Sequence, residues 1–194
     1  MIRRIGWVAV ATILVLATGS GANAQQAAPP DAPKMADMGP VANPVSTTVK
    51  GQVPRFSKNM VAAAEAMPAE KYSFKPTPEM NTYAHLVMHI VQSNNTLCSK
   101  ISGQAAPEAK IADTDPKDKL VAALKSSFEY CTTALANVDD SKLGEQMMLF
   151  GNRPASRAAA LIGLSGSWND HYGAQAIYLR LSGILPPTVQ PAKQ

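Results

Sequence analysis

The chain has 194 residues, of which 46% are hydrophobic, and a formal net charge of +4. The chain has 18 basic and 14 acidic residues. Two of the basic residues, Arg3 and Arg4, lie in the predicted leader, so 16 basic residues remain without it. So small a charge, with no stripe of Lys and Arg interleaved with aromatic residues, argues against nucleic-acid binding. The remaining length suits one domain with a real core.

Residues 1–24 have the pattern of a secretory signal peptide. Arg3 and Arg4 form a basic start, an apolar run follows, and Ala22-Asn23-Ala24 is a small-x-small cleavage site. The apolar run is too short to span a bilayer. The arginine pair also occurs in twin-arginine signals, but its surroundings favour general secretion. We expect an exported protein, periplasmic or secreted, without a membrane anchor after cleavage.

Residues 25–44 are rich in proline and alanine and poor in large apolar side chains. Such a segment cannot bury enough surface to offset the entropy of ordering, so we expect a disordered linker. The folded domain is expected at residues 45–189.

The first helix is predicted from apolar residues at spacings of three and four between Val49 and Met67, ended by Pro68. Pro54 interrupts this stripe and leaves two alternatives. Either the helix begins at Pro54, or it begins near Ser46 and kinks between Gly51 and Pro54.

Three more helices are predicted further along the chain. The first of them covers about 82–101, the next about 115–138, starting at an Asp-Pro pair, and the last about 154–182, ended by Gly183. Residues 140–153 cannot be assigned, because their apolar run is too short to tell a strand from a buried turn. No strand-period segment is long enough to build a sheet, so the expected fold is all-α, a four-helix bundle.

The two cysteines, Cys98 and Cys131, predict the order of the helices. In an exported chain they favour a disulfide, with a free buried pair as the alternative. A disulfide needs Cα atoms within about 7 Å. Each cysteine lies about 22–24 Å from the start of its helix, so they meet at one height only if helices 2 and 3 run parallel. The intervening residues reach about 40 Å when extended. This predicts an up-down-down-up bundle with a long crossover between helices 2 and 3.

His85 and His89 stand at i and i+4, which stacks two imidazoles on one helix face and suits a shared metal ion. In the predicted topology His171 lies about 16 Å from the bundle end at which helix 2 begins, His89 about 10 Å and His85 about 5 Å. A simple up-down-up-down bundle would separate His171 and His89 by about 15 Å. The three rings are therefore candidate ligands of one ion.

Four stretches together resemble the DinB/YfiT-like superfamily of metal-binding four-helix bundles, and in particular its exported bacterial members: KNMVAAAEAMP, YSFKPTPEM, HLVMHI with SNNTLCSKISG, and DHYGAQAIYLRLSGILPP. The resemblance covers about residues 45–187. It implies a metal site made by one histidine of helix 2 and an H-x-x-x-H pair on helix 4. His89 matches the histidine of helix 2, and His171 matches the second histidine of the helix 4 pair. Ser167 stands at the position of the first histidine of that pair. With His85 beside His89, the i, i+4 pair would have moved to helix 2.

The predicted site is therefore a divalent metal ion on His85, His89 and His171, with zinc first and nickel, iron or manganese as alternatives. Ser167, Trp168, Asp170 and Tyr172 are candidates for the surrounding pocket, although aromatic residues at helical spacing more often belong to a core. The alternative is three histidines that pack beside the core without a ligand.

Two functions remain open from the sequence. The first is a metalloprotein whose ion lowers the pKa of a bound water or thiol. The family that the chain resembles includes thiol-dependent transferases and isomerases. The resemblance therefore implies a metal-dependent hydrolase or S-transferase. The second is a metal-free, non-catalytic bundle that binds a small molecule or an envelope partner. A homodimer is left open.

Overall fold

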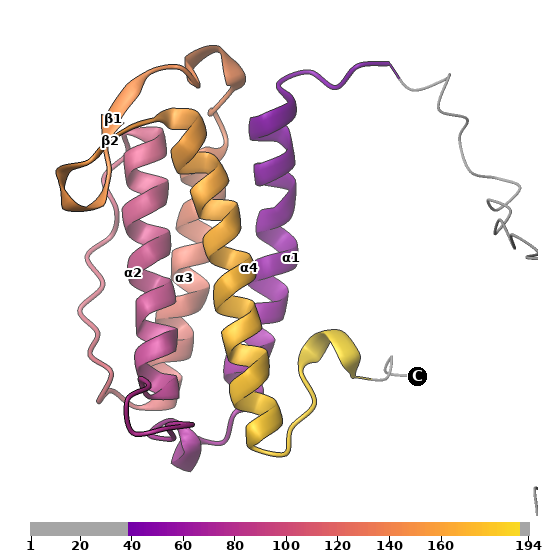
Figure 1. Ribbon diagram of the computed structural model, residues 1–194, viewed down its shortest axis with the longest axis vertical. Coiled ribbons are helices and arrows are strands. Elements are labelled where there is room, and N and C mark those ends of the chain that lie inside the picture. Colours follow the sequence, from indigo (N-terminus) through magenta and orange to yellow (C-terminus); the bar gives the residue numbers. More distant parts are fainter. Residues whose placement is uncertain (1–38, 191–194) are drawn as a thin grey trace, which may run out of the picture. The chain divides into compact units, whose positions relative to one another are not determined.

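The computed structural model describes residues 39–190, and these contain four long α-helices (Figure 1). Their bounds are α1 (Pro44–Ala66), α2 (Tyr83–Ser102), α3 (Lys117–Leu135) and α4 (Arg157–Leu181). The predicted signal peptide and most of the predicted linker lie outside the described residues. Within residues 39–190 no helix combines the length and apolar character needed to cross a bilayer.

Helix α1 runs through Pro54, so the alternative in which a helix starts near Ser46 is the correct one. An interior proline costs about 3 kcal/mol, and the packing around it offsets this cost, because Val53 and Phe56 are each only 3% exposed. The helix start is capped from far along the chain. The carboxylate of Asp140 accepts hydrogen bonds from the backbone N–H of Ser46 at 2.8 Å and of the preceding residue at 3.0 Å.

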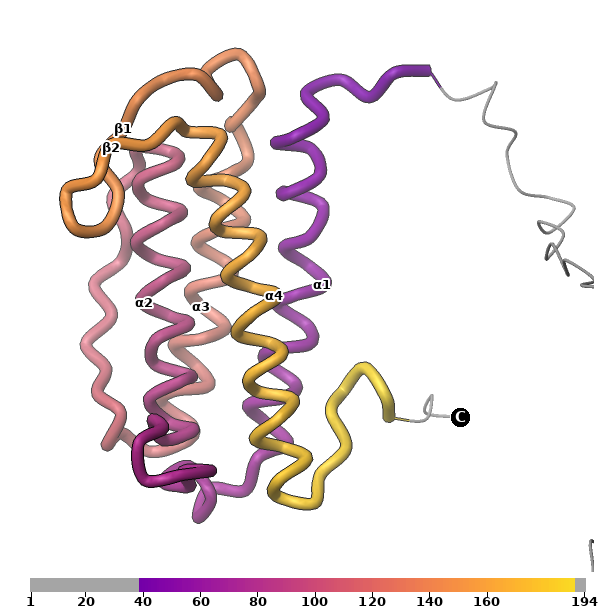
Figure 2. The backbone as a smooth tube through the Cα atoms, in the orientation of Figure 1, coloured from indigo at the N-terminus to yellow at the C-terminus, as the bar shows by residue number. Residues whose placement is uncertain are grey.

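Helix α2 begins at the Thr82 side chain, which accepts a hydrogen bond from the His85 backbone N–H, and ends at Gly103 in the left-handed conformation. The predicted disulfide is confirmed: Cys98 of α2 and Cys131 of α3 are bonded, with 5.3 Å between their Cα atoms. Both are fully buried. Figure 2 traces the segment after α2 back along the bundle before α3 begins.

A buried polar network ties three helices together. The Trp168 indole N–H of α4 donates to Asn94 Oδ1 of α2 at 2.8 Å, and Asn94 Nδ2 donates to Ser127 Oγ of α3 at 3.0 Å. The Trp168 ring packs against Phe56 and Phe128. These hydrogen bonds satisfy polar groups inside the core and join α4 to α2 and α2 to α3.

The unassigned segment before α4 contains a small hairpin, which corrects the expectation of no sheet. Strands β1 (Gln146–Met148) and β2 (Pro154–Ser156) pair antiparallel. Gly151 and Asn152, with φ of 65° and 55°, supply the left-handed backbone of the turn. Helix α4 therefore starts after Ser156, whose side chain caps it, and not at Pro154. In Figure 1 the hairpin lies beside one end of α2 and α4.

Candidate functional site

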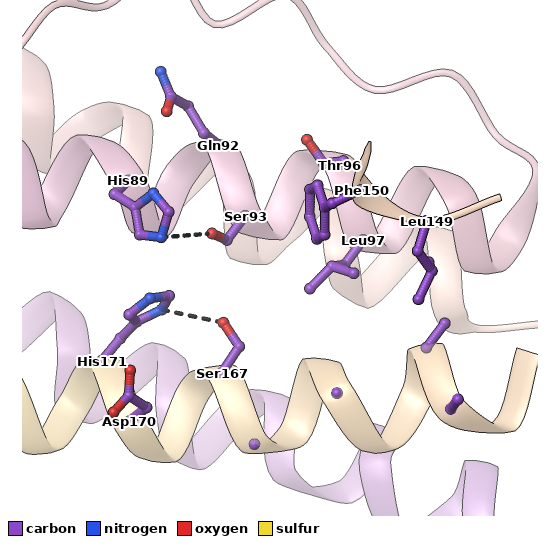
Figure 3. Close-up of a pocket in the computed structure, with 14 residues that line it drawn as sticks. His89, Gln92, Ser93, Thr96, Leu97, Leu149, Phe150, Ser167, Asp170 and His171 are labelled. Atoms are coloured by element: carbon purple, nitrogen blue, oxygen red, sulfur yellow. Dashed lines mark hydrogen bonds between the residues drawn. The ribbon is translucent and has the colours of Figure 1, made fainter. Parts of the chain in front are cut away.

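A cavity of about 810 Å³ lies between α2 and α4 and is overhung by the hairpin. Figure 3 shows its two helical walls and the side chains between them. One end is polar and is made by His89 and Ser93 of α2 with Ser167 and His171 of α4. The other end is apolar and includes Leu97, Leu149, Phe150, Ala159 and Ala160.

The cavity exists because α4 carries small residues along this wall. Gly163 and Gly166 both line it, and a Cβ atom added at either would meet nothing within 4 Å. The run of Ala and Gly at the start of α4 was visible in the sequence, but its meaning depended on which helix faced it.

The two histidines at the polar end face each other across the helices. The His89 and His171 ring centroids are 5.0 Å apart, and the ring planes meet at 88°. Each ring also contacts a serine four residues away on its own helix. Ser93 Oγ lies 3.4 Å from His89 Nε2, and Ser167 Oγ lies 3.2 Å from His171 Nδ1. The result is a cluster of two imidazoles and two hydroxyls at one end of an apolar cavity (Figure 3).

The His171 imidazole is neutral at pH 7. The residue is 8% exposed, and burial lowers the pKa of its imidazole below the usual 6.5; the neighbouring His89 lowers the pKa further, while Asp170 raises it. With Nδ1 engaged by Ser167, the described residues provide no hydrogen-bond partner for His171 Nε2. That nitrogen is available to a ligand.

His85 does not join this cluster. Its Nδ1 lies 3.1 Å from the Asp113 carboxylate in the crossover, and its ring lines a neighbouring hollow of about 380 Å³. Among the residues that the structure describes, no three His, Cys, Asp or Glu side chains are grouped so that they could hold a metal ion. Two of the three predicted ligands therefore come together, and the third is held away by a carboxylate that belongs to another part of the chain.

The other predicted pocket residues divide into two groups. Ser167 and Asp170 line the cavity. Trp168 does not, because it is fully buried in the core and hydrogen-bonded to Asn94. Tyr172 points elsewhere, with its hydroxyl donating to Thr188 Oγ1 at 2.9 Å.

Sequence reasoning missed most of the apolar and glycine lining of the pocket, including Gly163 and Phe150. Ser93 also lines the pocket, and its i+4 spacing to His89 mirrors the Ser167 to His171 spacing. The place of Phe150 could not be predicted, because it depends on the hairpin.

A family model for the DinB superfamily matches residues 55–171, more than half of the chain, so the chain belongs to that superfamily. No curated protein matches it.

Solved structures share the fold. A DinB-like protein from Bacillus cereus is 18% identical with a TM-score of 0.62, covering 74% of this chain and 97% of that one. A DinB-like protein from Bacillus subtilis is 20% identical with a TM-score of 0.58, covering 70% and 92%. A mutant of the mycothiol-dependent maleylpyruvate isomerase is 12% identical with a TM-score of 0.54, covering 66% and 59%. These likenesses, all at 20% identity or less, show a shared fold.

The donor set here falls short of a catalytic zinc site, in which three protein ligands leave one position open. His89 and His171 supply two nitrogens, and the hydroxyls that contact these rings, those of Ser93 and Ser167, are already hydrogen-bonded to them. A neutral hydroxyl is a much weaker ligand than an imidazole or a carboxylate. As arranged, the side chains do not complete the ligand set that the family resemblance implied.

Proposed function

We propose that this protein binds a small organic molecule in the cavity between α2 and α4 without using a metal ion. The observation that carries the proposal is the joining of an apolar cavity of about 810 Å³ to a polar end made by His89 and His171. Sites for small molecules are typically concave and largely apolar, with a few convergent polar groups that orient the ligand.

The polar end favours a ligand group that exchanges hydrogen bonds. A neutral imidazole offers one donor and one acceptor, and a serine hydroxyl offers both. Because burial keeps His171 neutral, a hydroxyl, amine or carbonyl of the ligand suits it better than a fully ionised anion. The apolar end then buries the ligand's hydrocarbon part, at roughly 25 cal/mol per Å² removed from water.

The test fills the cavity. Gly163→Leu puts a larger side chain on the cavity wall, where an added Cβ atom meets nothing within 4 Å, and Gly173→Leu, on the same helix but outside the cavity wall, is the matched control. Binding of 1-octanol is measured by calorimetry. We expect binding to wild type and to the Gly173 variant, and loss of binding in the Gly163 variant. Equal binding by all three proteins would refute the cavity as the site.

The second candidate is a divalent metal ion on His89 and His171, supported by the 5.0 Å between their ring centroids and by the metal site that the family resemblance implies. It requires further ligands from water or a substrate, or a turn of Asp170 or His85 toward the pair. Metal-dependent hydrolysis or thiol S-transfer would follow only from this candidate.

Zinc titration of metal-free protein at pH 7.5 separates the two candidates. Stoichiometric zinc that is lost in both His89→Ala and His171→Ala, and kept in His85→Ala, supports a two-histidine metal site. Absence of stoichiometric zinc, with 1-octanol binding retained, supports the metal-free proposal.

We also propose that the protein is exported and that its helices follow the up-down-down-up order. The leader pattern of residues 1–24 supports export, and the 5.3 Å between the Cα atoms of Cys98 and Cys131 supports the order. Mass spectrometry of protein expressed with its leader tests export: a mature chain that begins at Gln25 is expected.

A further inference from the structure

A second hollow continues the main cavity past the paired histidines. It measures about 380 Å³ and is lined by Glu79, His85, Leu86 and Ala174, among others. His89 lines both hollows, so the two are neighbours along α2 at this residue. From His85 to Leu97 the shared α2 wall is roughly 18 Å long at about 1.5 Å per residue. A ligand that occupied both hollows would therefore be long and narrow.

The charges along this groove are all of one sign, although the chain as a whole is basic. Asp170 lines the main cavity and Glu79 the second hollow, and no Lys or Arg lines either hollow in the part of the chain that the structure describes. Glu79 stays ionised well below neutral pH, because hydrogen bonds from its own backbone and from the Thr77 side chain lower its pKa. The groove therefore attracts cations.

His85 contributes an acceptor to the second hollow. Its Nδ1 lies 3.1 Å from a carboxylate oxygen of Asp113. An ionised carboxylate can only accept hydrogen bonds, so Nδ1 must carry the proton. In the neutral ring Nε2 is then left with a free lone pair, which can accept a hydrogen bond from an ammonium group. The contact that removes His85 from the histidine cluster thus prepares it for a different role.

We propose that the groove binds an elongated amphipathic amine, with its alkyl chain in the main cavity and its ammonium group in the second hollow beside Glu79 and His85. This inference rests on the proposed function, because the alkyl chain occupies the same cavity. It adds a second subsite and the charge of the ligand.

The first experiment compares decylamine with 1-decanol by calorimetry at pH 7.5. Decylamine should bind more tightly than the alcohol of equal chain length. Glu79→Gln should weaken decylamine by about two- to fivefold, the range for one exposed charge pair, and leave 1-decanol unchanged. Glu70→Gln, an exposed carboxylate outside both hollows, is the control and should change neither.

The second experiment blocks the second hollow alone. Ala174→Trp should weaken decylamine by at least as much as Glu79→Gln does, yet leave 1-octanol binding in the main cavity intact, which also shows that the variant is folded. The second subsite is overturned if decylamine and 1-decanol bind with equal affinity and the Glu79 and Ala174 variants have no effect. The proposed function still stands in that case, provided that Gly163→Leu loses 1-octanol binding. If Gly163→Leu still binds 1-octanol, both fail.

Discussion

His89 on α2 and His171 on α4 lie edge to face across the helices, with 5.0 Å between their ring centroids. Each ring has a serine hydroxyl four residues away on its own helix. This pairing makes the polar end of the cavity, and it places one imidazole where burial and a neighbouring ring act together on its proton affinity.

Stability should fall as the pH is lowered from 7.5 to 5, because of His171. Its pKa in the folded protein is lowered from 6.5, chiefly by burial, so the unfolded chain takes up the proton first. The contribution of the neutral His171 ring to the free energy of unfolding is complete above about pH 6.5 and is lost progressively as the pH falls below it. Urea denaturation across this range measures the slope, and His171→Gln should flatten it while the more exposed control His85→Gln should not.

The pH dependence of stability that His171 causes can be separated from the loss of stability caused by protonation of carboxylates. Asp115, Asp139 and Asp140 have pKa values lowered from 3.8, so they reduce stability only at more acidic pH. Hydrogen bonds to the carboxylates of Asp115 and Asp139 lower their pKa, and at Asp140 such bonds outweigh the opposing effect of burial. A wild-type stability that rises as the pH falls from 7.5 to 5 would contradict the assignment to His171.

Replacing Cys98 and Cys131 together with alanine should lower the free energy of unfolding by about 3–4 kcal/mol. The bond closes a loop over a sequence separation of 33, and the constraint on the unfolded chain accounts for a loss of about this size. Guanidinium denaturation of the double variant measures the change. Because both sulfurs are fully buried, a mild reductant should leave the native wild type oxidised; rapid reduction without unfolding would argue against the buried bond.

Asn94→Ala should lower the free energy of unfolding by about 1–3 kcal/mol, since it leaves the buried indole N–H of Trp168 without its acceptor. Trp168→Phe in the same background should recover part of the loss, because it removes the unpaired donor. Only Trp7 and Trp168 occur in the sequence, so in a chain lacking residues 1–24 the tryptophan emission reports this site alone. An unshifted emission spectrum in Asn94→Ala would show that the hydrogen bond is not formed.

Gly163→Ala should raise the free energy of unfolding by about 0.5–1 kcal/mol. Glycine inside a helix loses more conformational freedom on folding than alanine does, and the added methyl group enters open space. Gly173→Ala, on the same helix, should give a similar gain. Thermal denaturation of both variants checks this, and a loss of stability at Gly163 alone would mean that the cavity wall packs more closely than the structure indicates.

The disulfide and the pairing of His89 with His171 could be predicted because helices are regular. The apolar stripes gave the helix bounds within a few residues, and a constant rise of about 1.5 Å per residue then gave the height of each side chain along its axis. Two cysteines at matching heights could be bonded, and they are. The same arithmetic brought His171 near His89.

Only the tertiary structure decided the remaining details of the site. His85 turns to Asp113 in the crossover, Trp168 turns to Asn94 in the core, and the hairpin brings Phe150 over the cavity. Periodicity shows which face of a helix is apolar, but not which partner a polar group on that face will find. The partner depends on groups that are distant in sequence. Here Asp113 separated His85 from the other two histidines, and the packing of α4 against α2 placed the glycines of α4 on the cavity wall.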